Sequence, residues 1–103
     1  MNLIKEFRKK IIQKQKFFSN KNNDDLIVDL KEKGIINNRI LDSIKKVPRE
    51  LFIDDSFIEF IYENIPLPIA CNQTISQPYV VACMIDCLKL KKTDKVLEIG
   101  TGT

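Results

Sequence analysis

Residues 96 to 103 combine residue types that can hold a nucleotide-like ligand. They read VLEIGTGT, which is an apolar run followed by the acidic Glu98 and a glycine turn. An apolar run that enters such a turn is typical of a parallel strand with a ligand at its carboxyl end. Glycines there let the backbone approach the ligand closely. Nicotinamide and flavin enzymes carry glycine turns in the same place, and a plain strand-to-loop turn is the structural alternative.

A second motif lies upstream and is more specific. PLPI (Pro66 to Ile69) is separated by three residues from QTISQPY (Gln73 to Tyr79), and VPRELF (Val47 to Phe52) precedes both. With Glu98 completing an E-x-G-x-G pattern in VLEIGTGT, these segments resemble the protein-L-isoaspartate O-methyltransferases. The resemblance covers roughly Leu26 to Thr103, in the family's order and spacing.

The resemblance implies a protein-repair activity that depends on S-adenosylmethionine. Such enzymes methylate the free α-carboxylate of L-isoaspartyl residues in damaged proteins, which would be the partners of this chain. Ser76 matches the family's active-site serine. The cofactor-binding residues that it implies are Ile69, Ala70, Cys71, Asn72, Glu98, Ile99, Gly100, Thr101, Gly102 and Thr103.

The three-residue spacer departs from the family's PLPIGxGQTIS pattern. Ala70, Cys71 and Asn72 stand where the family commonly has glycines. Asparagine tolerates a left-handed backbone, whereas alanine adopts it at a cost of roughly 1 kcal/mol or more.

The residue types agree with carboxylate methylation. The chain has no histidine, so it lacks the commonest general base. A substrate carboxylate, with an ordinary pKa of about 4, is already ionised at neutral pH and needs none. We therefore expect Ser76 to donate a hydrogen bond to this carboxylate rather than to act as a nucleophile.

No metal site is expected. Cys71, Cys83 and Cys87 are the chain's three cysteines, and without histidine or a second cysteine pair they cannot close a zinc site. Their odd number favours reduced thiols.

Two short antiparallel helices are expected before the motifs. Asp24 or Asp25 can cap the first, which Gly34 ends. Asn37 can cap the second, which Pro48 stops after Val47. The side chains expected to face inward are Leu26, Ile27, Leu30, Ile40, Leu41 and Ile44.

The aromatic side chains of residues 49–64 follow no clean period, so we expect a helix-and-turn segment that buries them. They are Phe52, Phe57, Phe60 and Tyr62. Pro66 and Pro68 keep the next residues extended, in a loop that continues to Ile75.

Ser76 is expected to open a third helix by accepting a hydrogen bond from the backbone N–H of Tyr79. Pro78 suits the first turn, and the helix ends near Leu90. Its expected buried face comprises Val81, Met84, Ile85 and Leu88, and the expected strand comprises Val96, Leu97 and Ile99.

The predicted fold class is α/β. We expect a helical segment followed by the first strand and glycine loop of a Rossmann-like S-adenosylmethionine-dependent methyltransferase sheet, incomplete in this chain because one strand lacks neighbours. Residues 1–25 would be a basic extension and linker, and residues 26–103 the N-terminal part of the methyltransferase domain. The isolated chain is expected to be a monomer of low stability that binds S-adenosylmethionine weakly.

Composition indicates one soluble domain of the cytoplasm, since 44% of the 103 residues are hydrophobic, 30% are charged, and no apolar run could span a membrane. Residues 1–21 carry seven basic side chains against Glu6 alone, and Leu3, Ile4, Phe7 and Ile11 follow helical spacing. The alternative function is therefore a basic helical module that binds nucleic acid or a membrane surface, with a vestigial methyltransferase strand. A solvated lysine-rich face is the favoured interpretation, without nucleic-acid or membrane partners.

Overall fold

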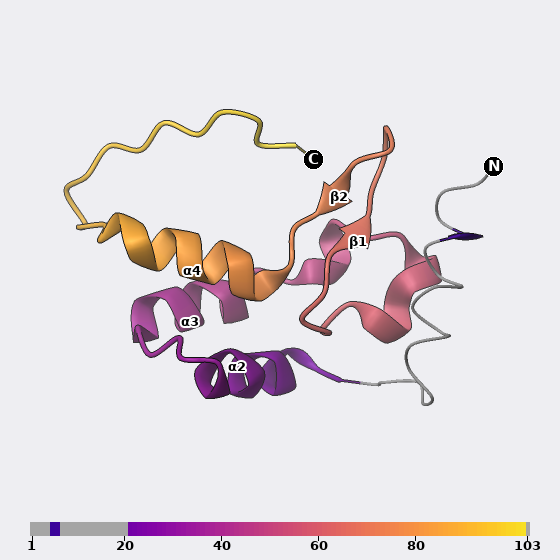
Figure 1. Ribbon diagram of the computed structural model, residues 1–103, viewed down its shortest axis with the longest axis horizontal. Helices are drawn as coiled ribbons and strands as arrows, with labels where there is room; N and C mark the ends of the chain where they lie inside the picture. The colour runs from indigo at the N-terminus through magenta and orange to yellow at the C-terminus, as the bar shows by residue number, and fades with distance from the viewer. Residues whose placement is uncertain (1–4, 7–20, 103) are drawn as a thin grey trace.

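The computed structural model describes residues 5, 6 and 21–102. Its helices α2, α3 and α4 lie in layers, and a β-hairpin stands at one end of α4 (Figure 1). The predicted apolar face, Leu3, Ile4, Phe7 and Ile11, lies outside the described residues. The elements are α2 (Asn23–Glu32), α3 (Asn38–Lys46), the 3₁₀ helices η1 (Arg49–Leu51) and η2 (Asp55–Phe60), β1 (Leu67–Pro68), β2 (Thr74–Ile75) and α4 (Pro78–Leu88).

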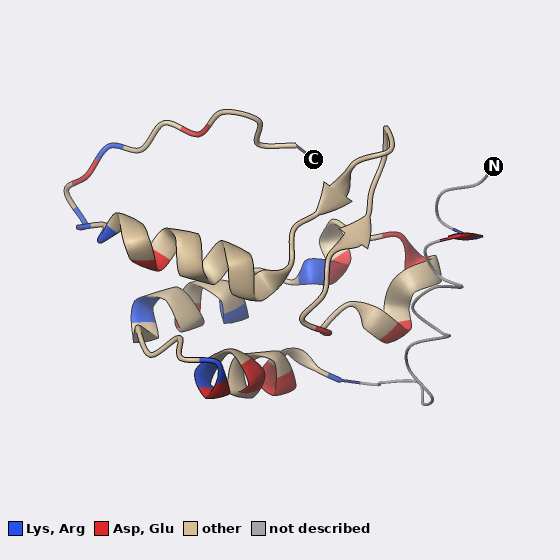
Figure 2. Cartoon of the chain, viewed as in Figure 1, with Lys and Arg blue, Asp and Glu red and all other residues tan. Residues whose placement is uncertain are grey.

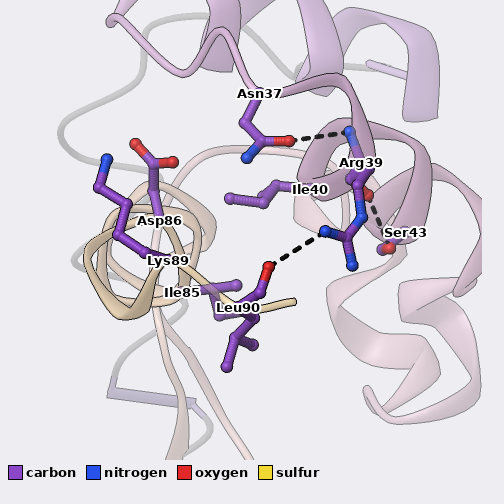
Figure 3. Close-up of a pocket in the computed structure, with 8 residues that line it drawn as sticks. All are labelled: Asn37, Arg39, Ile40, Ser43, Ile85, Asp86, Lys89 and Leu90. Atoms are coloured by element: carbon purple, nitrogen blue, oxygen red, sulfur yellow. Dashed lines mark hydrogen bonds between the residues drawn. The ribbon is translucent and has the colours of Figure 1, made fainter. Parts of the chain in front are cut away.

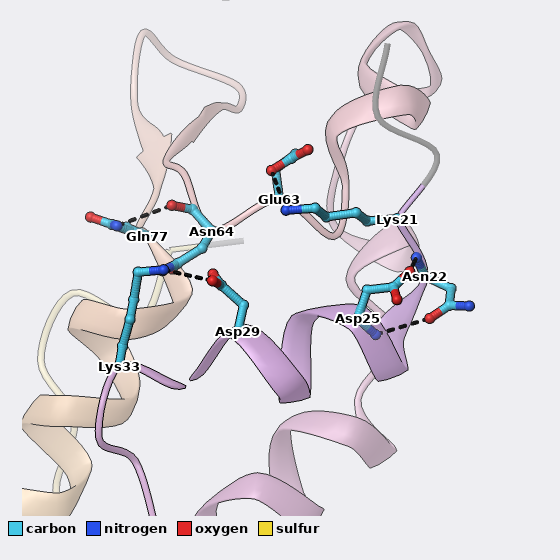
Figure 4. A network of polar contacts seen from close by, with 8 residues as sticks. All are labelled: Lys21, Asn22, Asp25, Asp29, Lys33, Glu63, Asn64 and Gln77. Atoms are coloured by element: carbon cyan, nitrogen blue, oxygen red, sulfur yellow. Dashed lines mark hydrogen bonds and ion pairs between the residues drawn. The ribbon is translucent and has the colours of Figure 1, made fainter. Parts of the chain in front are cut away.

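Helix α2 begins earlier than predicted. Its cap is Asn22, whose side-chain oxygen accepts from the Asp25 N–H at 3.0 Å, while Asp25 Oδ2 accepts from the Asn22 N–H at 2.8 Å (Figure 4). The prediction of a cap at Asp24 or Asp25 is wrong, because Asp25 takes the third helical position of this reciprocal pair. The end at Gly34 is confirmed: its φ is +103°, and Ile35 N–H reaches back to Leu30 O at 3.0 Å.

Helix α3 follows the predicted pattern. The Asn37 side chain accepts from the Arg39 N–H at 3.0 Å, and the helix stops before Val47 and Pro48. Helices α2 and α3 pack together with α4 around one set of buried side chains, the helical core. It comprises Leu26, Leu30, Ile35, Ile40, Leu41 and Ala82, with Ile27 and Ile44 packed at its margin.

Residues 49–64 form the predicted helix-and-turn segment, as two 3₁₀ helices. A second set of buried side chains, the aromatic core, comprises Ile53, Phe57, Phe60, Ile61 and Leu67. Tyr62 packs against both cores. The prediction that Phe52 belongs to the core is wrong. Its side chain is 41% exposed, because Phe52 lies in the turn after η1 and faces a cavity described below.

The predicted extended loop is instead an antiparallel hairpin. Leu67 pairs with Ile75 and Pro68 with Thr74, and the Ile69 N–H donates to Gln73 O at 2.9 Å. The turn between the strands has left-handed backbones at Cys71 (φ +60°) and Asn72 (φ +56°), as in a type I′ hairpin turn. Ala70 keeps a negative φ, so the spacer places no left-handed strain on alanine.

The predicted cap of α4 is wrong. Gln77 occupies the cap position without a side-chain bond, and the Tyr79 N–H donates to Asn64 Oδ1 at 2.8 Å instead of to Ser76. The strand β2 holds the chain beside β1 up to Ile75, so Ser76 lies in the link between strand and helix rather than at the helix end.

The buried face of α4 also differs from the prediction. Ala82 is buried and Ile85 is half-buried, but Val81, Met84 and Leu88 are exposed. Helices α2 and α3 lie on one side of α4, whereas no described helix or strand covers the other side, past which only the extended chain after α4 runs (Figure 1). Helix α4 therefore has apolar side chains on two sides, and only the side that carries Ala82 and Ile85 packs against α2 and α3.

The prediction of a strand at residues 96–99 is wrong for the described chain, which is mostly helical with one two-stranded sheet. The chain after α4 turns back and runs above it towards the hairpin (Figure 1). A strand requires a hydrogen-bonded neighbour, and the described residues provide none for this segment. No described helix is both long enough and apolar enough to cross a membrane.

Candidate functional site

The two sequence motifs line one cavity of about 600 Å³. The hairpin forms one wall, which we call the hairpin wall (residues 69–76). Residues 98–102 form the opposite wall, which we call the glycine wall. The lining residues are Phe52, Ile69, Ala70, Cys71, Gln73, Thr74, Ile75, Ser76, Val81, Glu98, Gly100, Thr101 and Gly102.

Most of the predicted site residues meet in this cavity, although they are up to 33 positions apart in sequence. Those that line it are Ile69, Ala70, Cys71, Ser76, Glu98, Gly100, Thr101 and Gly102. Asn72 and Ile99 are not among the lining residues; Asn72 is at the hairpin tip and the Ile99 side chain is 89% exposed. Thr103 lies outside the described residues.

Sequence reasoning missed five lining residues. Gln73, Thr74 and Ile75 belong to the QTISQPY motif itself, so their place in the motif was an available signal. Phe52 and Val81 were assigned to the core because apolar residues at irregular or helical spacing usually are core. Only the tertiary structure distinguishes a side chain that is buried in the core from one that lines a cavity.

The hairpin wall is tied to the aromatic core. Leu67 and Pro68 of β1 are fully buried, and β2 pairs with them through the backbone. The Gln73 N–H closes the turn by donating to Ala70 O at 3.3 Å. Because β1 is packed from beneath and bonded to β2 from the side, the backbone that carries Ser76 has a defined position.

Asn64 holds the residues on the other side of Ser76. Its backbone carbonyl accepts from Gln77 Nε2 at 3.0 Å (Figure 4), and its side-chain oxygen accepts from the Tyr79 N–H. Sequence reasoning missed Asn64, because an asparagine between an aromatic segment and a proline-rich one reads as an ordinary turn residue.

The glycine wall has a different character. Gly100 and Gly102 have φ values of +75° and +81°, and a Cβ on either would meet no atom within 4 Å. Among the described residues, glycine is therefore required there by the backbone conformation, since no neighbouring residue would meet a side chain. Residues 95–102 make no hydrogen bond with any other described residue.

Glu98 alone carries a charge among the described lining residues. Figure 2 shows that the hairpin has no charged residue, whereas charges of both signs lie on the helices and along the segment after α4. The cavity thus presents a single negative charge, apolar side chains, and the hydroxyl and amide groups of Gln73, Thr74 and Ser76.

Three ionisable groups outside the cavity lining form hydrogen bonds within the fold. Tyr62 donates to Glu50, and burial together with this bond raises the pKa of Tyr62 to about 12. The same bond lowers the pKa of Glu50. Arg49 Nε donates to Ile61 O at 2.6 Å, and burial lowers the pKa of its guanidinium. None of these groups is among the residues that line the cavity.

A smaller cavity of about 160 Å³ lies between α3 and the C-terminal end of α4 (Figure 3). Arg39 Nη1 donates to Leu90 O at 3.1 Å beside it and so ties α3 to the residue after the helix. Neither motif contributes to this cavity. Within the described residues no group of three potential metal ligands occurs, and all three cysteines are free.

Comparison with known proteins agrees with the motifs. A sequence model of the family described as protein-L-isoaspartate(D-aspartate) O-methyltransferase matches residues 20–103. Protein-L-isoaspartate O-methyltransferase of Proteus mirabilis is 56% identical over 79 residues, which cover 77% of this chain and 38% of that protein. The enzymes of the same name from Flavobacterium psychrophilum and Dictyoglomus turgidum are 50% identical over 80 residues and 51% over 78.

These matches cover 78% and 76% of this chain, and 38% and 36% of the two relatives. The chain therefore spans about two-fifths of the length of the curated relatives it matches, and the matched region is their N-terminal part. The resemblance expected from QTISQPY and VLEIGTGT is confirmed. The chain belongs to the protein-L-isoaspartate(D-aspartate) O-methyltransferase family.

Proposed function

We propose that this chain supplies the N-terminal part of an enzyme that uses S-adenosylmethionine to methylate the free α-carboxylate of L-isoaspartyl residues in damaged proteins. The observation that supports this most is the single cavity lined by both motifs, with Ser76 on one wall and the glycine turn on the other. Family membership supports the substrate class. In this proposal residues 26–103 belong to the methyltransferase domain, and residues 1–25 are an extension of it.

The cavity suits S-adenosylmethionine in size and charge. Its volume of about 600 Å³ lies within the range of small-molecule sites. When bound, S-adenosylmethionine supplies a methyl group activated by a cationic sulfonium. Gly100 and Gly102 would let the backbone approach the ligand, the residues around Ala70 and Cys71 would cover it, and the carboxylate of Glu98 would favour a cationic ligand.

Ser76 would hold the substrate. An ionised carboxylate needs no base, and no histidine is present to activate the serine. The Ser76 hydroxyl is exposed on the cavity wall and can donate one hydrogen bond to the carboxylate. Apolar lining side chains such as Ile69 and Val81 would exclude water, which strengthens this bond and keeps the reacting groups in line.

The test requires a protein that contains the whole domain. We define the completed protein as the full 103-residue chain followed by the part of the Proteus mirabilis relative that lies beyond the matched region. It should transfer a methyl group from S-adenosylmethionine to an L-isoaspartyl peptide and leave the matched aspartyl peptide unmodified. Equal methylation of the two peptides would contradict the proposed substrate.

Ser76→Ala in the completed protein should lower kcat/KM for the isoaspartyl peptide by about 10- to 150-fold, since hydrogen bonds to charged groups contribute about 1.5–3 kcal/mol. Ser43→Ala is the matched control. The Ser43 hydroxyl donates to Arg39 O at 2.7 Å on α3, away from the cavity, so its loss should leave kcat/KM unchanged. An unchanged rate in Ser76→Ala would remove Ser76 from the reaction.

The 103-residue chain alone should bind S-adenosylmethionine weakly, because the described chain does not support the glycine wall with hydrogen bonds. Calorimetric titration checks this expectation. Micromolar affinity for the isolated chain would show that the glycine wall forms without further support.

A further inference from the structure

We infer that Asn64 is the positioning residue for Ser76: it holds the first residues of α4 so that the serine hydroxyl faces the cavity. This inference rests on the proposed function, because it assigns a role in the reaction of that same site. Asn64 is not among the residues that line the cavity, so it would act through the backbone rather than by contact with a ligand.

Two different atoms of Asn64 bind two nearby residues. The backbone oxygen accepts from Gln77 Nε2 at 3.0 Å, and side-chain Oδ1 accepts from the Tyr79 N–H at 2.8 Å. The Tyr79 N–H is one of the unpaired donors of the first turn of α4, and Gln77 at the cap position provides no side-chain acceptor of its own. An asparagine 15 residues away in the sequence therefore caps this helix.

Ser76 is consequently held from both directions. Before it, Ile75 pairs with Leu67 in the hairpin. After it, Asn64 binds Gln77 and Tyr79. Asn64 and Leu67 are only three residues apart, so one short segment, residues 64–68, determines the backbone on either side of the serine. The helical propensity of α4 does not determine this position, because Ser76 lies outside the helix.

Only one of the two polar side-chain atoms of Asn64 forms a hydrogen bond with a described residue. Its Oδ1 is bonded, whereas its Nδ2 is buried and has no hydrogen-bond partner among the described residues. Replacing Nδ2 by an oxygen loses no bond, and a negative charge at the N-terminus of a helix is favourable. Asn64→Asp should therefore keep the cap, whereas Asn64→Ala should remove it.

The experiment is a double-mutant cycle in the completed protein, with isoaspartyl peptide as the substrate. Asn64→Ala should lower kcat by about 10-fold or more and change the KM for S-adenosylmethionine by less than about 3-fold, because only the serine is misplaced. Asn64→Asp should restore kcat to within about 3-fold of the parent. In the Ser76→Ala background, Asn64→Ala should add less than about 2-fold, since the hydroxyl that it positions is gone.

Asn23→Ala is the matched control. Asn23 Nδ2 donates to Lys45 O at 2.7 Å and so joins α2 to α3, at a distance from the cavity lining. Its loss should lower the melting temperature without changing kcat. The inference would be overturned if Asn64→Ala lowered the melting temperature as much as Asn23→Ala does but left kcat at the parent value.

The outcomes separate this inference from the proposed function. If Ser76→Ala retains full activity, the proposed role of Ser76 fails. Suppose instead that Ser76→Ala loses activity, but that Asn64→Ala lowers kcat by the same factor in the Ser76→Ala variant as in the parent. The two residues then act independently, Asn64 has only a structural role, and the inference fails. If Asn64→Ala does not fold, the Asn64→Asp variant tests the inference instead. A folded Asn64→Asp protein whose kcat is 10-fold or more below the parent value would overturn the inference.

Discussion

The two walls of the cavity are built differently. The hairpin wall rests on the fully buried Leu67 and Pro68 and is bonded through β1, β2 and Asn64. The glycine wall follows Leu97, which is 85% exposed, and residues 95–102 make no hydrogen bond with the rest of the described chain. The hairpin wall is thus stabilised by packing and hydrogen bonds within the described chain, whereas the glycine wall has no comparable support there.

The largest expected difference between the two walls is in how much the loss of one leucine side chain lowers the free energy of unfolding. Leu67→Ala in the 103-residue chain should lower the free energy of unfolding by about 2–5 kcal/mol, because it empties a buried position of the aromatic core. Leu97→Ala should change it by less than about 0.5 kcal/mol, because that side chain is exposed. Urea unfolding followed by circular dichroism measures both.

The same pair can sharpen the comparison in the completed protein. There, Leu97→Ala should cost about as much as Leu67→Ala if residues 96–99 become a buried strand. Equal costs already in the 103-residue chain would contradict the view that the glycine wall is unsupported.

The next effect concerns the backbone of the glycine wall. Gly100→Ala in the completed protein should weaken S-adenosylmethionine binding by about 10-fold, since a side chain at φ +75° costs about 1–2 kcal/mol. Gly34→Ala is the control, because Gly34 has a φ of +103° at the end of α2, away from the cavity lining. Gly34→Ala should lower thermal stability and leave the Kd for S-adenosylmethionine unchanged. If Gly34→Ala also weakens binding, the effect of Gly100→Ala on the Kd reflects a general loss of stability rather than a local role in the site.

A third prediction concerns Tyr62, which packs against both cores beneath the hairpin wall. Glu50→Gln should lower the pKa of Tyr62 from about 12 towards 10, because it removes a charged acceptor while burial still favours the neutral phenol. A raised phenol pKa stabilises the fold fully below pH 10, and this contribution is lost as the pH rises through about 12. Absorbance at the phenolate band, with Tyr62→Phe as the blank, follows the titration; an unchanged midpoint would rule out the Glu50 contact.

The smallest expected effect is at the hairpin tip. Cys71 has a φ of +60°, a conformation that asparagine adopts more easily than other side chains. Cys71→Asn should therefore raise the free energy of unfolding of the 103-residue chain by about 0.5–1 kcal/mol. Ala70→Asn is the comparison, since Ala70 has a negative φ and should gain nothing. A decrease for Cys71→Asn would argue against the type I′ turn.

Local chemistry explains which parts of the fold were predictable. Asn37 and Gly34 act through their own backbone and nearest turn, so the start of α3 and the end of α2 followed from residue type. The cap of α4 did not, because its acceptor, Asn64, comes from a distant part of the chain. The buried face of α4 was mistaken for the same reason: periodicity shows that Val81 and Met84 are apolar, but only the neighbouring helices decide which side is covered.

By itself, the sequence determined the family and the glycine turn, because these depend on residue types at fixed spacing along the chain. The tertiary structure alone decided that Ser76 and Glu98 line the same cavity and that Phe52 faces it rather than the core. It also decided that residues 96–99 remain unpaired in the described chain. Strand pairing and cavity lining arise from contacts between residues far apart in sequence, which no local pattern specifies.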